Sequence, residues 1–314
     1  MNILRMIGKR AVQSIITIIL VTMLVFLLIQ LVPGNPVANY LGATASEEQI
    51  KAMTHEYGYD RPAIVQYFSW IGGLFRGTMG KSISLQQEIS TVLFPRLGIT
   101  LSMVVPAFVI GTLLGVLLGI ICAKTRGSVF DTVITFIANI GVSMPMFWLA
   151  MMGMLVLALR LRLLPTSGYV SMARNPYQWF QHMIMPVMIL AWGVMAGFVR
   201  QTRSSLLEVI RQDYVTTARA KGIKPVAVTF RHQLRNALIP IVTVMGSRLG
   251  GMVGSTVLIE SVFGIPGLGS VMMKGISDRD FMIVANGVLI ISVFVALCNL
   301  VVDILYGFID PRTR

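Results

Sequence analysis

The sequence has few charged residues. Charged side chains make up 12% of its 314 residues and hydrophobic ones 55%, whereas a soluble domain carries about 25% charged residues. An integral membrane protein is therefore the expected class. Acidic residues are the scarcest, with 13 Asp and Glu against 26 Lys and Arg, so the formal net charge is +13. The basic residues are not interleaved with aromatic ones, as single-strand binding requires, so we expect no nucleic-acid partner.

Cysteine and histidine are also rare. Both cysteines, Cys122 and Cys298, fall in apolar runs, which argues against a disulfide framework outside the membrane. The three histidines, His55, His182 and His232, lie on different segments, so we expect no metal site. No nucleophile–base grouping is visible, and a membrane-embedded enzyme with catalytic residues is therefore disfavoured.

The sequence lacks a complete phosphate-binding loop. The stretch GTMGKS, from Gly77 to Ser82, resembles part of one. A P-loop needs a further glycine five positions before its Gly-Lys-Ser, because the backbone amides of that turn hold the phosphates. Phe75 occupies that position. We therefore do not expect this chain to bind or hydrolyse ATP.

Long apolar runs dominate what is present. A helix that spans a bilayer needs about 20 predominantly apolar residues. Six runs meet this length, at about 11–32, 97–122, 130–158, 183–202, 237–260 and 281–306. The first run is too long for a signal peptide and lacks a small-residue cleavage site, so we expect an uncleaved helix. The predicted fold class is an all-α, polytopic membrane protein with six transmembrane helices.

The distribution of basic residues predicts the orientation of these helices. When both termini are placed inside, the cytoplasmic segments carry a clear excess of Lys and Arg, as the positive-inside rule requires. We divide the chain into a first helix with an extracytoplasmic segment (1–96), a core of five helices (97–306) and a cytoplasmic tail (307–314).

The outer segment carries helix signals of its own. Ser46 and Gln49 form a capping-box pattern, and Gly58 is placed to end that helix. Pro62 suits the first position of a second helix with an apolar stripe. We expect this second helix to pack on the membrane surface or the bundle rather than to line a ligand pocket.

The cytoplasmic segment around residue 220 predicts a helix–turn–helix. Asp213 is a suitable N-cap for a helix over 214–221, and Gly222 ends it. Pro225 can start a second helix, and Pro240 marks a bend or the entry into the fifth span.

The partner of this segment stays open on physical grounds. The small residues Ala218 and Ala220 allow the close backbone approach that docking into another protein requires. Attraction of the basic side chains to anionic lipid headgroups is an equal alternative, at about 1 kcal/mol per residue.

Several stretches resemble a known family. YVTTARAKG (214–222) and RHQLRNALIP (231–240) resemble the signature loop of permease subunits of bacterial ABC importers. The closer resemblance is to the dipeptide, oligopeptide and nickel group, and LVPGNP (31–36), GVSMPMFWLA (141–150) and VFGIPGLG (262–269) match it in order. The general signature has Glu-Ala-Ala three residues before its glycine. Thr216, Thr217 and Ala218 stand at these positions here, so the glutamate is absent.

The resemblance implies a type I ABC importer permease in the bacterial inner membrane. It implies a second permease subunit in a heterodimer, two ATPase subunits that bind ATP and Mg, and an external binding protein. The solute would be a small peptide, nickel or a metal chelate. The residues that would couple this chain to the ATPase subunits, within the loop 203–236, are Tyr214, Ala218, Arg219, Ala220, Gly222, Arg231, Arg235 and Asn236.

Arg248 is the one charged residue well inside a predicted span. An arginine at a helix centre costs about 2.5–3.5 kcal/mol, so it is expected to face protein or water. It lies on the opposite side from Gly246, Gly250 and Gly254, whose spacing suits a close helix contact. It either pairs with another helix or lines a solute path for carboxylates. Few charges lie in the spans, which disfavours the alternative of a stand-alone secondary transporter or channel.

Overall fold

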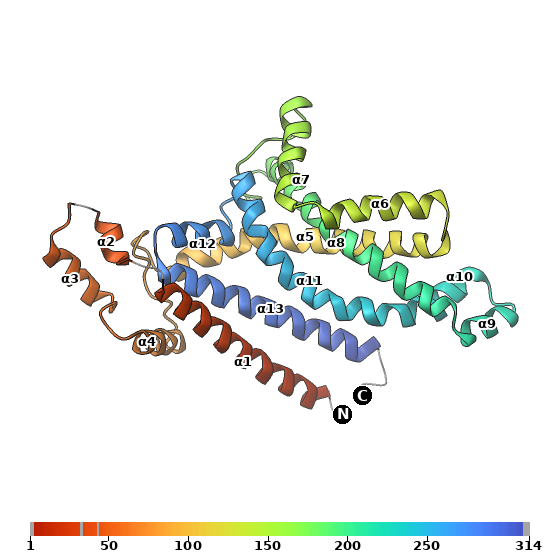
Figure 1. Cartoon of the computed structure of the whole chain (residues 1–314), viewed down its shortest axis with the longest axis horizontal. Helices are drawn as coiled ribbons and strands as arrows, with labels where there is room; N and C mark the ends of the chain where they lie inside the picture. The colour runs from red at the N-terminus through yellow and green to blue at the C-terminus, as the bar shows by residue number, and fades with distance from the viewer. Residues whose placement is uncertain (1–2, 32–33, 43, 310–314) are drawn as a thin grey trace. The chain divides into compact units, whose positions relative to one another are not determined.

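The part of the chain that the structure describes is mainly helical. The computed structural model describes residues 3–31, 34–42 and 44–309, without the side chains of 3–6, 230–232, 235 and 305–309. The elements, shown in Figure 1, are α1 (Ile3–Gln30), α2 (Pro36–Leu41), α3 (Glu47–Glu56), α4 (Ala63–Phe75), α5 (Ile89–Lys124), α6 (Val129–Ser143), α7 (Met146–Gly153), η1 (Met154–Arg160), α8 (Pro176–Ile210), α9 (Asp213–Ala220), α10 (Pro225–Ala227), η2 (Val228–Gln233), α11 (Leu234–Phe263), α12 (Leu268–Ser277) and α13 (Phe281–Ile309). Segments η1 and η2 are π-helical.

Five helices are long and apolar enough to cross a membrane: α1, α5, α8, α11 and α13. The third predicted span, 130–158, is not one straight helix, which corrects our expectation. The helices α6 and α7 with η1 are bent by 107° where they meet, as Figure 1 shows. Proline causes this break, because Met144 adopts the extended backbone that the residue before Pro145 prefers. The two parts form either one broken span or a re-entrant loop.

The described residues form two compact units, which we treat separately. Unit 1 comprises described residues of 1–8, 101–265 and 297–314, and unit 2 those of 9–100 and 266–296. The predicted domain division at residues 96 and 97 stays a prediction, and positions 310–314 of the predicted tail lie outside the described residues.

Helix α8 is the centre of unit 1, and α5 packs on it through three glycines. Gly111, Gly115 and Gly119 follow one another at intervals of four, so they lie on one face of α5. A Cβ atom added at each would come within 2.6 Å of Ala191, 2.5 Å of Phe198 or 2.6 Å of Thr202. The absence of side chains therefore lets the two helices approach closely, which is how helices associate in a membrane.

Glycines also allow α6, α7 and α11 to approach the other faces of α8 closely. Gly141 of α6 lies against Trp192, and Gly193 of α8 lies under the Met146 side chain of α7. The predicted glycine face of α11 is confirmed only in part. Gly246 faces Asn299 of α13 at close range, whereas no described atom lies within 4 Å of a Cβ built at Gly254.

Unit 2 contains the outer segment, whose local helix signals behave as predicted with one exception. Ser46 and Gln49 make both hydrogen bonds of a capping box at the start of α3. Gly58, just after α3, adopts a φ of +71°, which favours glycine. Pro62 is the N-cap of α4 and not its first helical residue, which corrects our expectation by one position. Because proline has no N–H to donate, both positions suit it.

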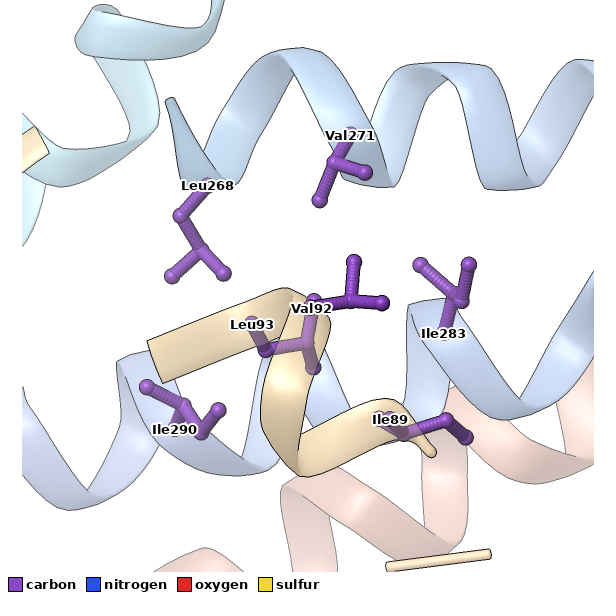
Figure 2. Close-up of a cluster of buried hydrophobic side chains, with 7 residues drawn as sticks. All are labelled: Ile89, Val92, Leu93, Leu268, Val271, Ile283 and Ile290. Atoms are coloured by element: carbon purple, nitrogen blue, oxygen red, sulfur yellow. The ribbon is translucent and has the colours of Figure 1, made fainter. Parts of the chain in front are cut away.

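Helix α4 packs on other helices of unit 2, which is one of the two positions that we expected for it. Tyr67 and Trp70 are buried against Phe26 of α1 and Ala285 of α13. The Trp70 indole N–H donates to Asn286 Oδ1 at 3.2 Å. Figure 2 shows a second buried cluster of this unit, in which three residues from α5 meet the facing side chains of α12 and α13. Its members are Ile89, Val92, Leu93, Leu268, Val271, Ile283 and Ile290.

The GTMGKS stretch has a structural use in unit 2. The Ser82 hydroxyl donates to Asp280 Oδ2 at 2.6 Å, and the same oxygen accepts from the backbone N–H of Ser84 at 2.9 Å. Lys81 forms an isolated β-bridge with Glu88. The serine of this stretch is thus bound to a buried carboxylate that holds the turn before α5.

Replacing Gly115 by alanine is expected to destabilise the protein. The new Cβ would lie 2.5 Å from Phe198 Cβ and 2.8 Å from the Met195 carbonyl oxygen, so α5 and α8 must separate. Overpacking of this kind costs about 1–3 kcal/mol of the free energy of unfolding. Thermal unfolding of the detergent-solubilised protein measures the loss.

Gly98→Ala is the matched control on the same helix. No described atom lies within 4 Å of a Cβ at Gly98, and alanine is the better helix former by up to about 1 kcal/mol. We expect unchanged or higher stability for this variant. Equal losses for both variants would contradict the role of close packing at Gly115.

Candidate functional site

The candidate site is the segment between α8 and α11. Figure 1 shows α9 and α10 as a short helical pair beyond the end of α8. The loop starts from α8, which ends at Ile210, and α9 follows from Asp213 to Ala220. It returns through α10 and η2 into α11. Both ends of the loop thus belong to long helices of unit 1.

The first arm forms close to where the sequence predicts. Gln212 is the N-cap of α9, and Asp213 is its first residue, so the predicted cap was wrong by one position. The Asp213 carboxylate still lies in the first turn, where the helix dipole favours a negative charge. Gly222 follows the helix with a φ of +75°, and its N–H donates to the Arg219 carbonyl at 2.9 Å. The predicted stop at Gly222 is confirmed.

The second arm differs from the expected separate helix. Pro225 starts α10 as predicted. Helix α10 then runs without a turn into η2 and on into α11. Pro240 lies inside α11 and not at its start, and the expected bend at this residue stays a prediction. The second arm is therefore the beginning of the same helical run that crosses the membrane.

A small apolar cluster holds the two arms together. Val215 and Ala218 of α9 pack on Val228 of η2, with Val209 and Ile223 at the edge. Ala218 is only 6% exposed. Its small side chain therefore serves packing inside the loop and does not face outward for a partner, whereas Ala220 is exposed.

One hydrogen bond joins two of the predicted residues across the arms. The Asn236 side-chain amide, in the first turn of α11, donates to the Tyr214 hydroxyl at 2.8 Å. The side chains of Arg231 and Arg235 lie outside the described residues. Tyr214 thus links the start of α9 directly to the helix that continues into the membrane.

The outward face of α9 is polar and small. The side chains of Thr216, Thr217 and Arg219 are exposed together with Ala220, and Gly222 is exposed at the turn. No described atom lies within 4 Å of a Cβ built on Gly222. This face is free to contact another protein, and no acidic side chain stands at the Thr216 and Thr217 positions.

Arg248 lies in α11 against α8. A Cβ atom built on Gly197 would come 2.8 Å from Arg248 Cζ, so the guanidinium group occupies space that a glycine leaves open. Arg248 is half-buried and forms no ion pair with the residues that the structure describes. The acidic partner that one interpretation expected is not found among the described residues, and both interpretations of Arg248, as a structural residue or as part of a solute path, stay predictions.

Sequence reasoning missed the ion pair that joins α6 to α8. The Arg203 guanidinium donates from Nε and Nη2 to the two oxygens of Asp131, each at 2.8 Å. Asp131 is buried and also accepts from the Gly127 N–H. These residues lie 72 positions apart, so no local spacing signals the pair. A scan for acidic residues in apolar runs would have singled out Asp131.

Unit 2 contains a cavity on the outer segment, partly lined by α4, for which we expected packing rather than a ligand pocket. Its volume is about 590 Å³, and its walls include Tyr57, Tyr59 and Trp70 with Arg61 and Arg76. Burial raises the pKa of Tyr59 well above its usual value. Among the residues that the structure describes, no group of three or more His, Cys, Asp or Glu could hold a metal ion.

Two family models cover nearly the whole chain. The model described as the binding-protein-dependent transport system inner membrane component matches residues 115–314, and its N-terminal counterpart matches residues 3–104. The chain belongs to the inner membrane component family of binding-protein-dependent transport systems. This membership confirms the predicted ABC importer permease and decides against a carrier or channel that works alone.

Relatives of this permease extend over its full length. The di/tripeptide transport system permease protein DppB of Pseudomonas aeruginosa is 37% identical over 335 residues, covering 99% of each chain. A Brucella abortus protein named as a peptide transport system permease is 38% identical over 306 residues, covering 98% of each. This permease is therefore a multi-pass inner membrane protein and a transport subunit, not itself an enzyme.

A solved structure shares the permease fold. The MetNI methionine ABC transporter, in inward facing conformations, matches with a TM-score of 0.55 over 70% of this chain and 97% of the other. The sequence identity is 18%, so the likeness concerns the fold alone. It confirms the predicted all-α permease fold.

Removing the Tyr214 hydroxyl is expected to loosen α9. Tyr214→Phe loses the hydrogen bond from Asn236, which contributes about 0.5–1.5 kcal/mol. Amide hydrogen exchange in α9 should accelerate by up to about tenfold, as measured by mass spectrometry on the purified protein. Tyr40→Phe is the control, because Tyr40 is equally exposed at 41%. Unchanged exchange in α9 for Tyr214→Phe would contradict the link between the arms.

Proposed function

We propose that the loop 203–236 transmits the movement of ATPase subunits to the membrane helices of this permease. The observation that carries the proposal is the continuity of α10, η2 and α11, because no residue outside a helix separates the loop from the membrane helix. The cluster of Val215, Ala218 and Val228 makes α9 part of the same body. A rigid element of this kind can bias one of two conformations.

The residues of the loop divide into two groups. Ala218 packs inside the loop, and Asn236 donates a hydrogen bond to Tyr214 there. These three residues therefore maintain the shape of the loop. Arg219, Ala220 and Gly222 are exposed and form the contact with the ATPase. Arg231 and Arg235, whose side chains are outside the described residues, complete the second arm.

The assembly we propose has four further kinds of partner. A second permease subunit pairs with this chain as a heterodimer, and two ATPase subunits bind ATP and Mg on the cytoplasmic side. An external protein delivers the solute, and lipid surrounds the spans. The chain itself carries no cofactor and has both termini in the cytoplasm, in keeping with its excess of basic residues on the segments that would lie there.

The solute we propose is a small peptide. The support is that full-length relatives at 37% and 38% identity are named as di/tripeptide or peptide permeases. Arg248 fits this substrate, because a guanidinium pairs with a carboxylate such as a peptide C-terminus. The family group that the sequence resembles also includes transporters of nickel and metal chelates, but the names of these relatives support neither solute.

Gly222→Val is expected to abolish ATP-driven uptake while the protein still inserts in the membrane. A valine is strained at a φ of +75° by about 1–3 kcal/mol, so the turn between the arms must change shape. Uptake of labelled peptide into proteoliposomes and the membrane level of the protein are the two measurements.

Gly77→Val is the matched control for this substitution. Gly77 has a φ of +80°, and no described atom lies within 4 Å of a Cβ built there. The same strain thus arises far along the chain from the loop. Normal uptake by Gly222→Val, or equal loss for both variants, would contradict the coupling role.

Arg248→Gln is expected to weaken uptake of peptides with a free C-terminal carboxylate. A hydrogen bond to a charged group contributes about 1.5–3 kcal/mol, so the apparent affinity should fall by roughly 10-fold to 150-fold. Peptides with an amidated C-terminus should be affected little, and Arg248→Lys should retain part of the affinity. Unchanged uptake of both peptide types by Arg248→Gln would leave Arg248 with a structural role only.

A further inference from the structure

A basic groove lies in unit 1, between the beginning of α6 and the last turns of α8. Its volume is about 580 Å³. Four arginines line it, namely Arg126, Arg200, Arg203 and Arg211, together with Glu208 and Leu207. Arg200, Leu207 and Arg211 recur at intervals of seven and four, so they share one face of α8. The lining overlaps the first part of the loop 203–236 and reaches the N-cap of α9 at Gln212, but it includes neither the exposed residues of α9 nor Arg248.

The charges in the groove leave an excess of positive charge. Asp131 neutralises Arg203 through their two hydrogen bonds and fixes that side chain in place. Arg126, Arg200 and Arg211 form no ion pair with the described residues. Glu208 offsets one of them, so two positive charges remain. The guanidinium groups of neighbouring exposed arginines repel one another, and an anion bound between them removes this repulsion.

The helix beside the groove exposes a large apolar surface. Val129, Phe130 and Phe136 of α6 are 76%, 71% and 64% exposed. Thr135, which lines the groove, is the neighbour of Phe136 in the chain. Basic side chains and exposed apolar ones therefore adjoin along α6, and both α6 and α8 belong to candidate membrane spans.

We propose that this groove binds the phosphate headgroup of an anionic phospholipid, with the acyl chains on the exposed face of α6. Basic pockets between transmembrane helices on the cytoplasmic side suit such headgroups, and a guanidinium binds phosphate through two parallel hydrogen bonds. Two excess positive charges match a headgroup with one phosphate or with two, of the phosphatidylglycerol or cardiolipin type. The inference rests on the proposed orientation, which places the groove at the cytoplasmic leaflet.

The test compares two triple variants of the complete transporter. The groove variant carries Arg126→Gln, Arg200→Gln and Arg211→Gln. The matched control carries Arg160→Gln, Arg162→Gln and Arg174→Gln, three exposed arginines outside the groove, so both lose the same charge. Each assembly is purified in mild detergent, its retained lipids are identified by mass spectrometry, and its thermal stability is titrated with short-chain phosphatidylglycerol or with inorganic phosphate.

The groove variant should retain less anionic lipid and bind phosphatidylglycerol more weakly. The expected loss is about fivefold for each arginine and on the order of a hundredfold for all three. The control should behave as the unmodified protein, and inorganic phosphate should not stabilise either. Single substitutions at Arg126, Arg200 and Arg211 keep the test decisive if the triple variant does not fold.

Three results would overturn the proposal. Equal lipid retention by both triple variants would show that the groove does not select lipid. Stabilisation by inorganic phosphate as strong as that by phosphatidylglycerol would identify a free-anion site instead. Loss of the ATPase subunits with unchanged lipid would identify a protein contact. Because lipid binding is measured without transport, its failure is distinguishable from a failure of the coupling role at Gly222.

Discussion

The close contact between α5 and α8 is the constraint on which unit 1 depends. Lipid tails are as apolar as leucine side chains, so burial alone gives helices in a membrane little reason to associate. Gly111, Gly115 and Gly119 solve this problem by bringing two backbones together over three successive turns. With α8 held in this way, its remaining faces can carry Gly141 of α6 and Arg248 of α11.

The loop after α8 is attached at its two ends to helices with different surroundings. Helix α8 ends in the loop but is held by α5 and by the Asp131–Arg203 pair. Helix α11 continues the loop without a break. In the coupling role that we propose, a movement of α9 would reach α11 along the helical run, because no residue outside a helix separates α10, η2 and α11.

Local signals in the sequence predicted local structure well, but they did not predict contacts between residues that are distant in the sequence. The capping box of Ser46, the turn at Gly222 and the helix start at Pro225 depend on a few neighbouring residues, so they are visible in the sequence. The burial of Ala218 depends on Val228, and the Asp131–Arg203 pair depends on two helices meeting. The bend before Pro145 shows a third case: an apolar run of sufficient length concealed a local break that proline alone signals.

Glycine has two different uses on the faces of α8, and the difference bears on Arg248. The glycines of α5 admit the backbone of α8, whereas Gly197 of α8 admits a guanidinium group. A charged side chain half-buried between two helices avoids lipid without being neutralised there, so it keeps its capacity to bind an anion. Any sliding of α11 along α8 moves this group past Gly197. The loop and the candidate solute contact thus lie on the same two helices, and a displacement of α11 by the loop necessarily changes the surroundings of Arg248.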